Sequence, residues 1–161
     1  MAYLPDEATF LKRAQQGNLV PVWKELLADQ ETPVSAYERL RADLRRENPE
    51  AFTFLLESVE GGENIARYSF LGGNPQLVIS SEGRTVTVRY ADGRTEVKQD
   101  TDPLEALRAV LKPYRPVPDP ALPRFFGGLV GFMGYDIIHQ FEPRVGLAPV
   151  RDLPSPDAQF I

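Results

Sequence analysis

The strongest constraint on the fold is a β-hairpin pattern in the middle of the chain. Residues Thr85 to Tyr90 alternate with period two, as residues of a half-buried strand do. The sequence Ala91-Asp92-Gly93-Arg94 follows, and a second polar strand comes after it. Asp-Gly between two strands is a strong hairpin signal, because both residues tolerate the backbone of a tight turn. We therefore expect antiparallel pairing here.

The other elements are mixed in order. Helix starts are predicted at Asp6, at Thr32-Pro33 and at Asp102-Pro103, where a capping side chain precedes apolar residues at helical spacing. Further strands are expected over 52–59, 68–71 and 77–80, and the apolar character of 52–59 suggests a strand covered on both faces. No regular strand-helix repeat is present. The order predicts an α+β fold with layered antiparallel sheets and flanking helices, not a doubly wound sheet.

The second half of the chain contains a connector and a glycine-rich run. Five prolines lie within 113–123, which predicts an extended connector. Residues 125–135 are apolar with four glycines and predict a buried strand. A short helix capped by Asp136 and a loop over 143–157 should follow.

The chain stops at Phe160-Ile161, where a new apolar run begins. Domain ends are more often polar. We expect residues 1–161 to be one incomplete part of a larger fold.

Composition excludes several classes of function. The net charge is −5 and the pI about 5.0, which offers no basic surface for nucleic acid or an anionic membrane. The chain has no cysteine, and His139 is its only histidine. A disulfide framework and a multi-histidine metal centre are thereby excluded. Asp6 and Glu7 interrupt any signal peptide, and the longest apolar stretch is too short to span a bilayer. We expect a cytoplasmic protein.

A polar pair follows the apolar run at Glu57-Ser58. One interpretation is that the strand reaches solvent at Glu57. The other is a polar pocket in which Glu57 holds an ammonium group and Ser58 makes one hydrogen bond. Arg67 comes ten residues after Glu57, across a turn. It either forms a cross-strand ion pair or faces the same ligand.

The glycines of 126–136 do not match a phosphate-binding loop. Their spacing fits neither the dinucleotide fingerprint nor the P-loop, whose lysine is missing. Close backbone packing is the favoured explanation.

Three segments carry a resemblance to a known family. They are Leu55-Leu56-Glu57-Ser58, the run from Ala66 to Gly72 and the run from Gly127 to Asp136. In this order and at these separations they closely resemble the N-terminal region of anthranilate synthase component I. The resemblance extends over essentially the whole chain.

The resemblance implies a function for the whole protein. The family is a magnesium-dependent lyase that converts chorismate and an amino donor into anthranilate and pyruvate in tryptophan biosynthesis. A glutamine amidotransferase subunit delivers its ammonia. The family's Leu-Leu-Glu-Ser segment forms part of an allosteric feedback site for L-tryptophan. This implies L-tryptophan-binding roles here for Leu56, Glu57 and Ser58, with Arg67 a neighbour.

The resemblance also implies what these residues lack. The family's chorismate and magnesium residues lie in a larger C-terminal region, absent from these 161 residues. We therefore expect no catalytic residue and no metal ligand in this chain, and no activity from it alone. Two alternatives are the same region of the aminodeoxychorismate synthase large subunit and a free-standing amino-acid-binding regulatory module.

Overall fold

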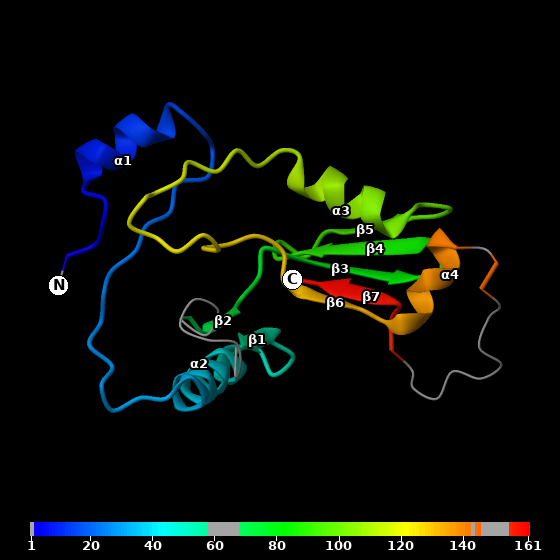
Figure 1. The fold of residues 1–161 in the computed structure, drawn as a ribbon, viewed down its shortest axis with the longest axis horizontal. Helices are drawn as coiled ribbons and strands as arrows, with labels where there is room; N and C mark the ends of the chain where they lie inside the picture. Colours follow the sequence, from blue (N-terminus) through cyan, green and yellow to red (C-terminus); the bar gives the residue numbers. More distant parts are fainter. Residues whose placement is uncertain (1, 58–67, 143, 146–154) are drawn as a thin grey trace.

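The computed structural model describes residues 2–57, 68–142, 144–145 and 155–161 (Figure 1). The helices within these ranges are α1 (Glu7–Ala14), α2 (Pro33–Glu47), α3 (Pro103–Leu111), the 3-10 turn η1 (Tyr135–Ile137) and α4 (Ile138–Phe141). The strands are β1 (Thr53–Leu56), β2 (Phe70–Gly73), β3 (Leu77–Glu82), β4 (Thr85–Tyr90), β5 (Thr95–Lys98), β6 (Gly131–Met133) and β7 (Ala158–Phe160). All strand pairs described are antiparallel, so the predicted α+β class is confirmed.

The predicted helix starts are confirmed because each capping side chain accepts a backbone hydrogen bond. Asp6 accepts from Thr9 N at 2.8 Å, and Asp102 accepts from Leu104 N at 2.8 Å. Thr32 accepts from Ser35 N, while the Ser35 hydroxyl accepts from Thr32 N, which forms a complete capping box. These bonds satisfy N–H groups that have no partner within the helix.

The core lies between one face of the larger sheet and α3. This sheet has the strand order β5-β4-β3-β7-β6, and α3 lies along it in Figure 1. The buried cluster consists of Leu77, Ile79, Val86, Val88 and Ala106. Burying these side chains is the main favourable contribution to folding, at about 1.5–3 kcal/mol for each large aliphatic side chain. None of the helices in the described ranges is long and apolar enough to cross a membrane.

Strand β7 lies inside the sheet, where it pairs with both β3 and β6. The Asp157 carboxylate, just before it, accepts from Gly83 N at 2.5 Å, and the Asp157 carbonyl accepts from Gly134 N at 2.7 Å. Gly83 occupies the tight β3–β4 turn at φ +55°, a conformation that costs glycine little. The sequence predicts a loop over 143–157. That prediction does not foresee that Asp157, its last residue, fixes the start of β7 through these hydrogen bonds.

The prediction of a buried strand over 125–135 is wrong. The strand β6 has only three residues, and all of them are exposed. Its glycine has a packing role nevertheless, because a Cβ at Gly131 would collide with the Gln159 carbonyl oxygen of β7. The predicted cap at Asp136 is also wrong. Gly134 occupies the N-cap position of η1, without a side-chain hydrogen bond.

The proline-rich connector 113–123 holds the N-terminal segment. Arg13 of α1 donates to Asp119 at 2.5 Å, and both side chains are largely buried. Trp23 Nε1 lies 3.4 Å from the same carboxylate, and an isolated bridge joins Leu19 to Pro116. A desolvated carboxylate needs such partners, so this cluster fixes the segment on the connector.

The hydrogen bond from Arg13 lowers the pKa of Asp119. A lowered folded-state pKa stabilises the docked state above the unfolded value of about 3.9, and this contribution is lost as the pH falls through the folded pKa. We expect the emission of Trp23, the single tryptophan, to change below about pH 4, where docking weakens. The measurement is a fluorescence titration from pH 7 to pH 2.

Two variants complete this test. Asp119→Asn should show the undocked emission already at pH 7. Asp43→Asn is the matched control, because it breaks only the exposed Asp43–Arg46 pair of α2. An unchanged spectrum for Asp119→Asn would contradict the role of the cluster.

Candidate functional site

The candidate site lies at one end of the β1–β2 hairpin. The register pairs Leu55 with Leu71 and Leu56 with Phe70. The two segments therefore pair in antiparallel fashion, the arrangement on which the suggested proximity of Glu57 and Arg67 depends. In this antiparallel pair, β1 ends where β2 begins. Glu57, which follows β1, and Tyr68, which precedes β2, therefore lie at the same end of the hairpin.

Helix α2 supports one face of this hairpin. The hydroxyl groups of Tyr37 and Thr53 share a hydrogen bond at 3.0 Å. A Cβ at Gly73 would lie 2.5 Å from Leu44 Cδ1, so the helix and β2 approach closely because residue 73 has no side chain. Since side chains alternate along a strand, this face carries the residues 53, 55, 71 and 73.

The opposite face of the hairpin is apolar and points away from α2. On this face Leu56 lies directly opposite Phe70. Phe54 lies opposite Gly72 and covers it with its ring. The ring of Phe70 meets that of Phe125 edge-on, with centroids 5.1 Å apart and planes at 89°. Such a T-shaped pair is a favoured aromatic geometry. The contact joins Phe70, in the second of the three segments that carry the family resemblance, to Phe125, which lies two residues before the third.

The predicted site residues divide into those the structure describes and those it does not. Leu56 is 45% exposed, on the apolar face. Glu57 is exposed, which agrees with the simpler interpretation that the strand reaches solvent there. Ser58 and Arg67 lie outside the described residues. The expectation that β1 is covered on both faces is wrong, since its residues are partly buried or exposed.

Sequence reasoning missed the aromatic residues beside Leu56. Tyr68 and Phe70 lie two residues apart with ring centroids at 6.1 Å, and Phe70 then contacts Phe125. Period-two spacing could have placed the first two rings on one face of a strand. No local pattern identifies Phe125 as their partner, because that contact joins distant parts of the chain.

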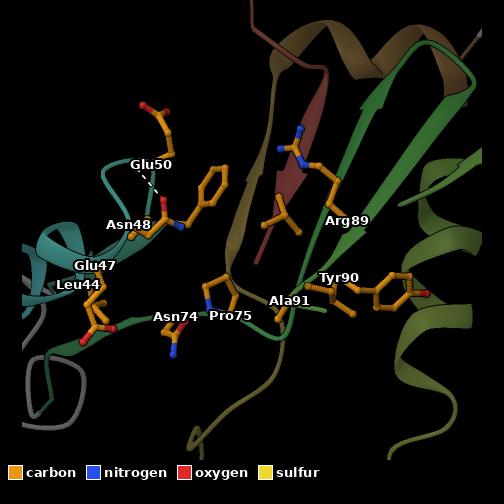
Figure 2. A pocket seen from close by; sticks show the side chains of 13 residues that line it. Leu44, Glu47, Asn48, Glu50, Asn74, Pro75, Arg89, Tyr90 and Ala91 are labelled. Carbon is orange, nitrogen blue, oxygen red and sulfur yellow. Dashed lines mark hydrogen bonds between the residues drawn. The ribbon is translucent and has the colours of Figure 1, made fainter. Parts of the chain in front are cut away.

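A groove with a volume of about 550 Å³ lies elsewhere, between the end of α2 and strands β3 and β4 (Figure 2). Figure 2 shows Glu47 and Glu50 on the helix side and Arg89 on the strand side. All three side chains are exposed. Of the predicted tryptophan-site residues that the structure describes, neither Leu56 nor Glu57 lines the groove.

The described residues do not suit a magnesium ion. In the ranges given above, no three side chains of the types His, Cys, Asp and Glu form a group that could hold a metal. Magnesium prefers several carboxylate or other oxygen ligands.

Comparison with curated proteins gives consistent relatives. The chain is 42% identical over 153 residues to anthranilate synthase component 1 of Synechocystis sp., which covers 95% of the chain and 29% of that protein. It is 37% identical over 150 residues to the protein of that name from Acetivibrio thermocellus, covering 92% and 28%. The corresponding match in Acinetobacter calcoaceticus is 38% over 138 residues, covering 84% and 26%. The chain thus spans less than a third of these relatives. No family model matches it.

The contact between α2 and the hairpin predicts a large effect of a small substitution. Gly73→Ala places a methyl group against Leu44, Thr53 Cγ2 and the Phe52 carbonyl oxygen. Overpacking of this kind costs about 1–3 kcal/mol. We expect a matching loss in the free energy of unfolding, measured by urea denaturation. Gly127→Ala is the control, because nothing lies within 4 Å of a Cβ there. Equal effects of the two substitutions would refute the packing argument.

Proposed function

The chain belongs to the family of anthranilate synthase component 1, as an N-terminal region of it. We propose that it forms the N-terminal part of the large subunit of that enzyme. In this proposal the whole subunit is a lyase that forms anthranilate and pyruvate from chorismate and an amino donor. The observation that carries it is the identity of 42% over 95% of the chain to a protein of that name. The chemistry, with its magnesium and its amidotransferase partner, belongs to the region beyond these residues.

The hairpin end is proposed as part of a feedback site for L-tryptophan. An amino-acid ligand brings an ammonium group, a carboxylate and an indole, which need an acid, hydrogen-bond donors and an apolar wall. Glu57 supplies the acid at the end of β1, and Ser58 and Arg67 are proposed as the donors. Leu56, Phe70 and Phe125 offer the apolar surface.

The exposure of Glu57 is compatible with this role. A site shared between two regions of a protein stays open when one of them is absent, and its carboxylate then remains solvated. A solvated carboxylate pays no desolvation cost, whereas a buried one requires a counter-charge. The ammonium group of the ligand would supply that counter-charge once the second region encloses the site.

The proposed feedback site predicts how tryptophan inhibits variants of the full-length subunit. Ser58→Ala removes a hydrogen bond worth about 0.5–1.5 kcal/mol, so the inhibition constant should rise several-fold. Glu57→Gln should raise it further, because the ligand ammonium loses its counter-charge. Uninhibited turnover should stay close to normal in both. The measurement is an inhibition curve for each variant.

The control for this experiment is Glu50→Gln, an exposed glutamate before β1 that should leave inhibition unchanged. If Ser58→Ala abolished turnover while the affinity for tryptophan stayed intact, the segment would be catalytic. The sensing role would then be wrong. Calorimetry on the chain alone should show weak binding of tryptophan or none.

The proposal also predicts that the 161-residue chain alone makes no anthranilate from chorismate, magnesium and ammonia. The reason is that the chain spans less than a third of its relatives, and the chemistry is proposed to belong to the remainder. A fluorescence assay for anthranilate measures it, with the full-length subunit as the positive control. Turnover of the chain above the rate without protein would disprove it, and aminodeoxychorismate from the full-length subunit would identify the other enzyme.

A further inference from the structure

The two edges of the larger sheet differ in their protection. At one edge, β5 carries Glu96 and Lys98, and the carboxylate of Glu96 lies 3.9 Å from Arg94 and 4.0 Å from Lys98. Charged side chains on an edge strand are a common protection against pairing with another strand, because pairing would desolvate them. The charged side chains of β5 therefore protect this edge of the sheet against pairing with another strand.

The opposite edge, formed by β6, has no such protection. From Leu129 to Tyr135 the sequence contains no charged residue and no proline. Phe132 is 46% exposed, Met133 41% and Tyr135 90%. Because neighbouring side chains of a strand point to opposite faces, Phe132 and Met133 leave both faces of this edge apolar. An uncharged apolar edge is a ready template for another strand.

The hydrogen bonds of β6 show which backbone groups are available. Val130 and Ile161 exchange both of their backbone hydrogen bonds, and Gly134 N donates to the carbonyl of Asp157. In an antiparallel pair such bonds fall on every second residue, so Val130, Phe132 and Gly134 face β7. The N–H and C=O groups of Gly131 and Met133 therefore point outward. Among the described residues, no backbone group is bonded to them.

We propose that the β6 edge receives a β-strand from the part of the subunit that follows this region. The inference rests on the proposed function, since it takes the subunit to continue as the relatives do. More than two thirds of each relative named above lies outside its match to this chain. The added strand bonds to Gly131 and Met133 and places uncharged apolar side chains beside Phe132 and Met133. A charged strand is disfavoured, because residues 129–135 carry no counter-charge.

Hydrogen exchange tests the proposal at single amides. The amides of Gly131 and Met133 should exchange freely in the chain alone and at least about tenfold more slowly in the full-length subunit. Val97 is the internal control. Tyr90 N bonds to the carbonyl of Arg94, so the alternation in β5 directs the amide of Val97 outward, and its exchange should not change.

The outcomes separate this proposal from the proposed function. Free exchange at Gly131 and Met133 in a full-length subunit that makes anthranilate would overturn the strand addition and leave the function standing. Protection in a subunit that makes no anthranilate would support the strand addition while the function fails. Protection that rises with concentration in the chain alone, and is absent from the full-length subunit, would assign the edge to a second copy and overturn the proposal.

A pair of charge substitutions gives a second measurement in the full-length subunit. Phe132→Lys should lower the thermal midpoint, because it buries a lysine in the new strand pair. Val97→Lys, on the protected edge, should leave it nearly unchanged. If both variants fold and have the same thermal midpoint, the proposal is wrong.

Discussion

The structure depends on the pairing of β7 between β3 and β6. Ser81 and Ala158 are partners in the register although they are 77 positions apart in the chain, so closing this loop costs considerable conformational entropy. The cost is offset by the hydrogen bonds of two neighbouring strands and by the Asp157 carboxylate, which holds the turn at Gly83. Without β7, the strand β6 would have no partner among the described residues, and the sheet would end at β3.

The position of β6 in turn places the glycine-rich segment against the hairpin. Phe125 lies just before the segment that leads into β6, and its ring packs on Phe70 of β2. Helix α2 holds the other face of the hairpin through Tyr37 and Leu44. The hairpin of the candidate site is thus contacted by α2 on one face and by Phe125 through the ring of Phe70. One of these contacts comes from a residue that lies outside the hairpin and 55 positions after Phe70 in the chain.

Local signals in the sequence were reliable because the interactions behind them are local. The caps at Asp6 and Thr32 and the hairpin at Asp92-Gly93 each involve groups within a few residues. Burial was predicted poorly, because it depends on partners that a pattern does not name. Residues 125–135 are as apolar as a buried strand, yet β6 is exposed. For the site, the sequence indicated strands at both segments and allowed for the solvent exposure of Glu57, but it did not establish that the two strands pair. It could not reveal the contact of Phe70 with Phe125.

The wrong burial predictions point to the same surfaces as the two proposals. Large exposed apolar patches mark interaction sites, and such a run with no cover among the described residues indicates a partner for it. The runs 52–59 and 125–135 both read as buried, and in both the described residues are partly exposed. One carries the proposed tryptophan site and the other the bare edge of the sheet. The ring contact between Phe70 and Phe125 connects them. A region that completes both surfaces would link ligand binding at the hairpin to its own docking on the sheet, which is what feedback on a distant active site requires.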